Sequence, residues 1–206
     1  MKTRAAVIVL AAGRGSRFIG TGHKLAQSIG GATVLGATLR HAIASHLPVV
    51  VVTTEPFADV ARRHVAARDV VVLPEAGTSQ ALAMGMGFSI AAGVSHRPDA
   101  SGWLVLPGDM PLVEPSTLQA VAQALDDHAV VYAQHKGRRG HPVGFASELY
   151  SELVRLEGDE GARRLVARYP AVGLEVDDPG VLVDVDTPAD LEAVRKSQRE
   201  AVLPRR

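Results

Sequence analysis

The sequence predicts an α/β protein, a Rossmann-like three-layer sandwich in which helices cover both faces of a mostly parallel sheet. Its strand candidates are apolar throughout instead of alternating, which is typical of strands buried on both faces. Helix-length segments separate these strands, as parallel crossover connections require. The 206 residues, 47% hydrophobic and 21% charged, suit one globular domain, so we expect residues 1–206 to form a single domain.

The strand candidates are short runs rich in valine, isoleucine and leucine. In chain order they are Ala5–Leu10, Val49–Thr53, Val70–Leu73, Trp103–Leu106 and Val130–Gln134. The first run follows a charged N-terminus, so the core of a signal peptide is an alternative interpretation. Its β-branched centre, Val7-Ile8-Val9, favours a buried strand, and the run is too short to cross a bilayer.

The segments between these strands have the length of helices. They are Thr33–His46, Phe57–Arg68, a segment within Ser79–Gly93, and Ser116–Asp127. The rest of the chain is less regular, which predicts an irregular sheet edge near the C-terminus. Short strands are expected at Val143–Phe145, Val172–Val176 and Val181–Val183, and helices at Glu148–Leu156 and Asp159–Arg168. A last helix should begin at Thr187, with Pro188 as its first residue and Asp190 completing a capping box.

The charge is unevenly distributed although the net charge is zero. No aspartate or glutamate precedes Glu55, whereas six lysines and arginines do. A basic lobe on a neutral protein indicates a small anionic ligand, and the aromatic content of 4% argues against a nucleic-acid partner. The chain has no cysteine, which excludes disulfides, thiolate metal sites and a cysteine nucleophile. We expect a cytoplasmic protein with no membrane partner.

A glycine-rich basic loop follows the first strand, where open α/β sheets bind their ligands. It runs from Leu10 to Phe18 as Leu-Ala-Ala-Gly-Arg-Gly-Ser-Arg-Phe, with Lys24 shortly after. Glycines let backbone N–H groups approach an anion, and the cations add fixed positive charge, so we predict a phosphate site. A surface turn with solvated charges is the alternative. The spacing is not that of a Walker A loop, and Phe18 replaces the third glycine of a dinucleotide fingerprint.

Two aspartates follow apolar runs that are far apart in the chain. Asp109 lies in the turn Pro107–Pro111, and Asp186 follows Asp184 just before Thr187. Because one or two carboxylates can hold Mg²⁺ next to phosphates, the pair is a candidate metal site. Taken singly, Asp109 could be a turn residue and Asp186 a cap. Asp184 should face away from Asp186 if the run is extended.

Together these motifs resemble the nucleotidyltransferases that include the molybdopterin cytidylyltransferases and guanylyltransferases. The resemblance rests on Leu-Ala-Ala-Gly-x-Gly-x-Arg with Lys24, on Gly-Asp-Met-Pro around Asp109, and on Asp-Val-Asp-Thr-Pro-Ala-Asp around Asp186. It implies that the loop wraps the NTP phosphates and that Asp109 and Asp186 hold Mg²⁺. The implied catalytic residues are Arg17, Lys24 and Asp109. The implied nucleotide-binding residues are Leu10, Ala11, Ala12, Gly13, Gly15, Lys24, Ser79, Gly87, Ser89 and Gly108.

Two segments resemble the acceptor side of the molybdopterin cytidylyltransferase branch. The segment Gly137–Phe145, read as a loop, contains Arg-Gly-His-Pro-Val, and Glu157–Arg163 contains Gly-Asp-Glu-Gly-Ala-Arg. The resemblance implies that they face the phosphorylated pterin. The implied acceptor-binding residues are Arg139, Gly140, His141, Pro142, Asp159 and Arg163. Solvated surface charge is the alternative for the arginines, and a general-base role for His141 is not needed because a phosphate acceptor is already an anion.

Choice of nucleobase depends on less specific residues. Ala12 matches the Leu-Ala-Ala-Gly of members that prefer CTP, where guanylyltransferases tend to carry Leu-Ala-Gly-Gly. Within Pro74–Ser89, Gly85–Ser89 matches the family's Gly-Met-Gly-x-Ser, while Gly77–Gln80 resembles a related branch equally well. The spacer Phe18–His23 departs from the usual Met/Phe-Gly-x-x-Asn, and Ala26 replaces a leucine.

The resemblance as a whole implies CTP:molybdopterin cytidylyltransfer with release of pyrophosphate. The expected cofactor is Mg²⁺, the expected partners are CTP and a phosphorylated pterin, and a molybdoenzyme or its chaperone could receive the product. The alternatives are a related transferase that uses GTP or another phosphorylated acceptor, and a nucleotide-binding module without catalysis.

Overall fold

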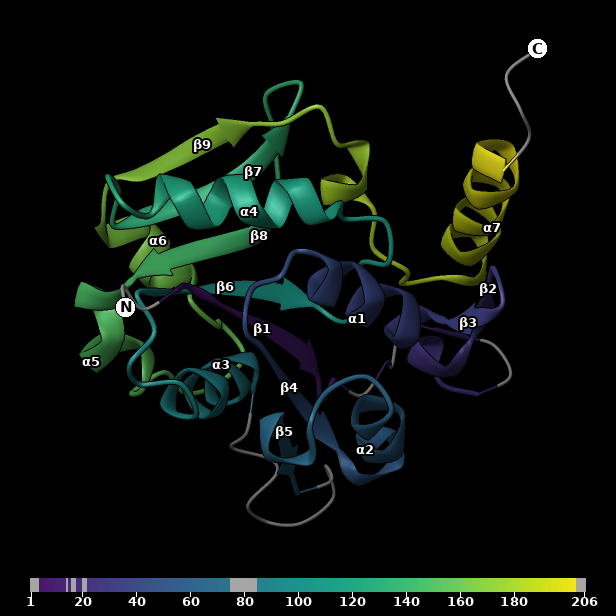
Figure 1. Cartoon of the computed structure of the whole chain (residues 1–206), viewed down its shortest axis with the longest axis horizontal. Helices are drawn as coiled ribbons and strands as arrows, with labels where there is room; N and C mark the ends of the chain where they lie inside the picture. The colour runs from purple at the N-terminus through teal and green to yellow at the C-terminus, as the bar shows by residue number, and fades with distance from the viewer. Residues whose placement is uncertain (1–3, 14, 16–17, 20–21, 75–84, 203–206) are drawn as a thin grey trace.

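The computed structural model of the chain describes residues 4–13, 15, 18–19, 22–74 and 85–202. Its main sheet has seven strands in the order β5-β4-β1-β6-β8-β7-β9 (Figure 1). The strands are β1 (Ala6–Ala11), β4 (Val49–Thr54), β5 (Val70–Leu73), β6 (Gly102–Pro107), β7 (Val130–His135), β8 (Arg138–Ala146) and β9 (Ala171–Glu175). A separate two-stranded sheet joins β2 (Ser28–Ile29) to β3 (Ala32–Thr33).

The sheet is parallel except at one strand. β4, β1 and β6 pair in parallel, as do β4 with β5 and β7 with β9, whereas β8 runs antiparallel to both β6 and β7. The predicted mostly parallel sheet is therefore confirmed. The irregularity lies inside the sheet, at β8 and at the register shift between Tyr132 and Gln134 on β7, and not at the edge strand.

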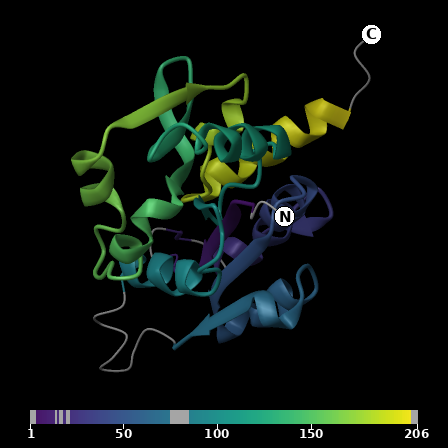
Figure 2. The same ribbon diagram turned by 60° about the vertical axis from the view of Figure 1, so that its left-hand side comes forward.

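Helices cover both faces of the sheet, giving the predicted three layers (Figures 1 and 2). One face packs against α1 (Val34–Ala44), α2 (Glu55–Arg62), α4 (Pro115–Ala124) and α7 (Pro188–Val202). The other packs against α3 (Met86–Ser95), α5 (Tyr150–Leu153) and α6 (Arg163–Arg168). Four 3₁₀ turns are described: η1 (Lys24–Ala26), η2 (Ala67–Asp69), η4 (Ser147–Leu149) and η5 (Pro179–Leu182).

The core consists of two apolar layers, one on each side of the sheet. Val7 and Val9 of β1 lie in the layer beneath α1 and α4, while Ala6 and Ile8 lie in the layer beneath α3. All four residues are fully buried. This alternation explains why β1 is apolar throughout its length, because both of its faces are covered.

Two sequence predictions near the C-terminus are wrong. The strand expected at Val181–Val183 is replaced by η5, in which Pro179 supplies a helical first position and the Asp178 side chain accepts a hydrogen bond from the Gly180 amide. The helix expected at Asp159–Arg168 begins only at Arg163, because Gly158 and Gly161 adopt positive φ angles of 66° and 57°.

Two further boundaries need correction. The strand predicted at Val143–Phe145 is confirmed but begins earlier, at Arg138, so most of the predicted loop Gly137–Phe145 is the strand β8. Its start pairs with β7, and its end pairs with both β6 and β7. The helix predicted at Phe57–Arg68 is α2, which ends at Arg62, and a short turn, η2, precedes β5. Among the described residues, no helix combines the length and apolar character needed to cross a membrane.

Candidate active site

The site lies where the order of the strands reverses direction. From β1 the chain passes to β4 and β5 on one side and returns to β6 on the other side, so the carboxyl ends of β1 and β6 are neighbours. Open α/β sheets bind ligands at this position. The Gly108 amide donates a 2.8 Å hydrogen bond to the Leu10 carbonyl, which ties the two strand ends together.

Gly108 also fixes the direction of the next residue, Asp109. A Cβ atom at Gly108 would lie 2.9 Å from the Leu10 oxygen, so only glycine permits this approach. The Thr38 hydroxyl on α1 donates a 2.9 Å hydrogen bond to the Gly108 carbonyl. The turn that carries Asp109 is therefore held by β1 and α1 together.

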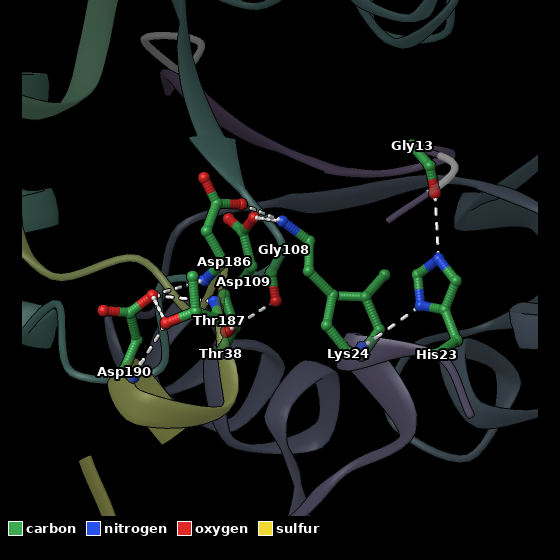
Figure 3. Close-up of polar contacts among 10 residues, drawn as sticks. Gly13, His23, Lys24, Thr38, Gly108, Asp109, Asp186, Thr187 and Asp190 are labelled. Atoms are coloured by element: carbon green, nitrogen blue, oxygen red, sulfur yellow. Dashed lines mark hydrogen bonds and ion pairs between the residues drawn. The ribbon is translucent and has the colours of Figure 1, made fainter. Parts of the chain in front are cut away.

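Asp186 reaches the same place from the other end of the chain. The Val185 amide donates a 2.9 Å hydrogen bond to the Asp109 carbonyl, which brings the two aspartates side by side. The predicted capping box then starts α7: the Thr187 amide donates to Asp190 Oδ2 over 2.7 Å, and the Asp190 amide donates to the Thr187 hydroxyl over 3.2 Å (Figure 3). The Thr187 hydroxyl in turn donates a 2.7 Å hydrogen bond to Asp190 Oδ2, and this bond, followed by the amide bonds from Thr187 and Asp186, lowers the pKa of Asp190.

Lys24 joins the two aspartates directly (Figure 3). Its Nζ atom lies 2.5 Å from Asp109 Oδ2 and 2.6 Å from Asp186 Oδ1. The three side chains are only 11%, 15% and 15% exposed. Burial alone would lower the pKa of Lys24, but attraction and hydrogen bonds from Asp109 and Asp186 outweigh burial and raise it. The ammonium therefore stays charged and offsets the repulsion between the two carboxylates.

The carboxylate pair retains an oxygen suited to a metal. Asp109 Oδ1 is buried and has no hydrogen-bond partner among the described residues, which is costly unless a cation or ligand completes it. Asp184 also lies within the field of this pair: desolvation raises the pKa of its carboxyl, and repulsion from Asp186 raises it further. Its carboxyl is therefore harder to ionise than that of a free aspartate.

The glycine-rich loop lies beside Lys24. Ala11 is buried at the end of β1, Leu10 and Ala12 are half-buried, and Gly13 is exposed. A Cβ atom at Gly13 would meet nothing within 4 Å, so this part of the loop faces open space. Arg17 and Ser79, which the resemblance assigns to catalysis and nucleotide binding, lie outside the described residues.

The remaining nucleotide-binding candidates lie at the start of α3. The Gly87 amide donates a 2.9 Å hydrogen bond to the Gly158 carbonyl, and a Cβ atom at Gly87 would lie 2.6 Å from the Glu157 oxygen. Ser89, two residues further along α3, is half-buried. The segment assigned to the nucleotide and the segment assigned to the acceptor therefore touch each other through their backbones.

The acceptor candidates separate into two groups. Arg139 and His141 lie on β8, where the Arg139 guanidinium stacks 4.6 Å from the centre of the Tyr132 ring. Burial lowers the pKa of His141, while the nearby Asp109 opposes this shift. Gly140 and Pro142 are buried, Gly140 against η5, whereas Asp159 and Arg163 are exposed.

Sequence reasoning assigned no role to two residues that the structure brings to the site. Thr38 lies inside a predicted helix and gave no signal beyond being polar on a buried face. His23 precedes Lys24 and was noted only as a departure from the family pattern. In the structure its Nε2 lies 3.0 Å from the Gly13 carbonyl, and its Nδ1 accepts a hydrogen bond from the Leu25 amide.

The sheet order, the glycine-rich loop and the carboxylate pair define a Rossmann-like α/β fold of the nucleotidyltransferase type. The family profile described as MobA-like NTP transferase domain matches residues 7–172, and the chain belongs to this family.

Two curated proteins show the relationship in sequence. The purine catabolism protein PucB of Bacillus subtilis is 33% identical over 119 residues, which cover 55% of this chain and 57% of PucB. The bifunctional protein GlmU of Chromobacterium violaceum is 32% identical over 118 residues, 57% of this chain and 25% of GlmU. The chain thus spans about half of the length of PucB and a quarter of GlmU.

Solved structures match nearly the whole chain. Rv0371c from Mycobacterium tuberculosis is 29% identical with a TM-score of 0.79, covering 95% of this chain and 99% of Rv0371c. A second structure of Rv0371c, in complex with manganese, has a TM-score of 0.76. The molybdopterin-guanine dinucleotide biosynthesis protein A from Archaeoglobus fulgidus shares the fold, with a TM-score of 0.71. It is 20% identical, and the match covers 95% of this chain and 99% of that chain.

Proposed function

We propose that this chain is a nucleotidyltransferase that moves CMP from CTP onto the terminal phosphate of molybdopterin and releases pyrophosphate. The observation that supports this most is the convergence of Lys24, Asp109 and Asp186 beside a glycine-rich loop at the point where the strand order reverses. Membership of the MobA-like NTP transferase family supports the reaction type. A module that only binds nucleotides needs no carboxylate pair next to the phosphates.

The carboxylate pair fits a divalent metal, which we propose is Mg²⁺. Asp109 Oδ1 is a buried, unpartnered oxygen, and Asp186 supplies the second carboxylate. Mg²⁺ keeps several waters and binds substrate phosphates, so two carboxylates are enough. When bound, the metal would neutralise negative charge on the phosphates.

The residues of the chain suit an in-line displacement. An oxygen of the acceptor's terminal phosphate attacks the α-phosphorus of CTP, and the bond from that phosphorus to the bridging oxygen of the β-phosphate breaks, so pyrophosphate leaves. The attacking group is an anion, so no general base is required. We propose that Lys24 and Arg17 bind the triphosphate and stabilise the charge that develops on it, while the backbone at Gly13 and Gly15 approaches the phosphates.

The acceptor is proposed to bind over β8 and the start of α6. The proposed contacts are Arg139, Gly140, His141, Pro142, Asp159 and Arg163. The stacking of Arg139 on Tyr132 fixes the plane of the guanidinium and leaves its N–H donors free to bind a phosphate in a bidentate manner. Because burial lowers the pKa of His141, its ring is neutral at pH 7 and can donate a hydrogen bond without adding charge.

CTP is proposed as the donor because Ala12 follows β1 directly and is half-buried there. Its methyl group leaves less room for a base than glycine would, which disfavours guanine. Another NTP or another phosphorylated acceptor is the alternative, and the similarity of GlmU over 57% of this chain agrees with it.

Pyrophosphate release with molybdopterin and each of the four NTPs tests the proposal. We expect CTP to be preferred over GTP by kcat/KM, by up to about 100-fold, and Ala12→Gly to narrow that ratio. A wild-type protein that prefers GTP would contradict the cytidylyl assignment and leave nucleotidyl transfer standing. A wild-type protein that releases no pyrophosphate with any NTP would overturn the reaction itself.

A further inference from the structure

His23 is held on several sides at the junction between the glycine-rich loop and η1 (Figure 3). Its Nε2 lies 3.0 Å from the Gly13 carbonyl oxygen, and its Nδ1 lies 3.2 Å from the Leu25 amide nitrogen. Its ring packs on Phe57 of α2 with 4.6 Å between the ring centres. A Cβ atom at Gly15 would lie only 2.9 Å from Nε2, so the ring fits directly against the loop backbone.

The two hydrogen bonds determine the state of the ring. The Gly13 carbonyl can only accept, so Nε2 must carry the hydrogen, and the Leu25 amide can only donate, so Nδ1 must be bare. Only the neutral Nε2–H tautomer satisfies both bonds. One side chain thus joins the loop that precedes Lys24 to the 3₁₀ turn that contains Lys24.

We propose that His23 is a positioning residue that holds the glycine-rich loop ready for the triphosphate. Its Nε2–H bond keeps the Gly13 carbonyl turned toward the protein, so this negative end of a peptide dipole does not face the phosphates. Its Nδ1 accepts the hydrogen bond that caps η1, which holds the ring in the orientation that the bond to Gly13 requires. This inference rests on the proposed binding of nucleotide by the loop.

Two substitutions separate the two bonds of His23. Asparagine places an oxygen near the position of Nδ1 and is a good N-cap, so His23→Asn keeps the bond from Leu25 but is too short to reach Gly13. Glutamine places an amide nitrogen near the position of Nε2, so His23→Gln keeps the bond to Gly13. A merely structural histidine would tolerate or reject both substitutions alike.

The experiment is calorimetric titration of CTP with Mg²⁺ into the wild-type protein and both variants, with melting temperatures measured alongside. We expect His23→Asn to weaken CTP binding by about tenfold, which corresponds to one hydrogen bond of roughly 1.4 kcal/mol, and His23→Gln to remain within about threefold of wild type. Both should melt near the wild-type temperature. The exposed His128, changed to asparagine, is the matched control and should bind CTP as the wild type does.

Nitrogen-15 chemical shifts of the His23 ring provide a readout that needs no ligand. They should report the Nε2–H tautomer in the free protein. Equal affinities for His23→Asn and His23→Gln, or an Nδ1–H tautomer, would overturn the positioning role. If neither the wild type nor either variant binds CTP, the proposed function is refuted instead of the positioning role. The two failures are therefore distinguishable.

Discussion

Lys24 lies where a divalent cation would be expected, since its ammonium group contacts one oxygen of each aspartate. A single positive charge therefore faces two carboxylates, so one negative charge is left over. Metal and Lys24 would share Asp109 and Asp186, and a nucleotide that draws Lys24 toward its phosphates would release oxygens for the metal. We propose this exchange from the contacts of the three residues, and two predictions test the site.

The first prediction is that Lys24→Met binds Mn²⁺ more tightly than the wild type when no nucleotide is present. Removing the ammonium leaves the two carboxylates uncompensated, so we expect affinity to rise by about fivefold or more. The same variant should bind CTP more weakly because it has lost a phosphate contact. Electron paramagnetic resonance of free Mn²⁺ measures the first effect, and Lys136→Met, at an exposed lysine, is the control. Unchanged or weaker Mn²⁺ binding would show that Lys24 and the metal do not compete.

The second prediction concerns Asp109→Asn, which keeps the side-chain shape and removes its charge. Lys24 still has Asp186, and one carboxylate repulsion disappears, so the melting temperature should change by no more than about 3 °C. We expect nucleotidyl transfer to fall by about three orders of magnitude. Asp127→Asn, at an exposed aspartate in the turn before β7, should keep full activity. An active Asp109→Asn protein would place the metal elsewhere.

The sequence predicted the two aspartates as a pair but not their contact with Lys24. Both belong to recognisable motifs, so the pair was predicted from residue type and position, although Asp109 follows a strand, β6, and Asp186 follows the 3₁₀ turn η5. Their role in holding a metal stays a prediction. The ion pairs join positions 85 and 162 residues apart, and such distances depend on the tertiary structure. Arg17 and Ser79 stay predictions, since both lie outside the described residues.

Among the elements, α4 illustrates support from a distant segment. The Asp178 carboxylate accepts hydrogen bonds from the Glu114 amide over 2.8 Å and the Thr117 hydroxyl over 2.7 Å, both at the N-terminus of α4. It also accepts one from the Gly180 amide in η5. Asp178 is only 2% exposed, so its negative charge is stabilised by these donors and by the helix dipole.

The third prediction is that Asp178→Ala destabilises the fold. Three donors would lose their acceptor in a buried place, which should lower the free energy of unfolding by about 2–4 kcal/mol. For a chain of this size we expect the melting temperature to fall by roughly 10 °C. Asp178→Asn retains an acceptor oxygen, so its melting temperature should fall less than that of Asp178→Ala. Equal melting temperatures for Asp178→Ala and the wild type would show that α4 does not depend on this cap.

The elements that the sequence predicted well are those with one clear signal. β1, β4 and β6 are apolar runs buried on both faces, so composition alone indicated them. The strand predicted at Val143–Phe145 is part of β8, but the start of β8 was predicted as a loop because Arg138, Arg139 and Gly140 suggest a turn. Pairing of Arg138 and Arg139 with β7 makes that start a strand. At η5 the local effect of Pro179 and the Asp178 cap outweighed the apolar run that suggested a strand.

At the scale of the whole molecule, the basic and acidic parts of the sequence meet at the candidate site. The first 54 residues carry six lysines and arginines and no acidic residue, and they supply β1, the glycine-rich loop and Lys24. Asp109 and Asp186 come from the acidic remainder of the chain. The site therefore lies where a basic part and an acidic part meet, an arrangement suited to holding a polyphosphate together with its counter-ion.

The nucleotide and acceptor segments also meet across the molecule. A Cβ atom at Gly85 would lie 2.1 Å from the Gly158 carbonyl carbon, so the start of α3 packs tightly against the turn that leads to α6. The two substrates of a transfer reaction must be held at a fixed separation, and direct contact between their proposed segments provides this.

Transfer of isotopic label between the substrates tests the central claim most directly. The wild-type protein would be incubated with Mg²⁺, molybdopterin and CTP labelled with phosphorus-32 at either the α or the γ position. If the chain is a nucleotidyltransferase, the α label should appear in the pterin product and the γ label in pyrophosphate, with neither transfer in Asp109→Asn. Release of the γ label as inorganic phosphate, or an α label that stays in CTP while the wild type binds both substrates, would contradict the account.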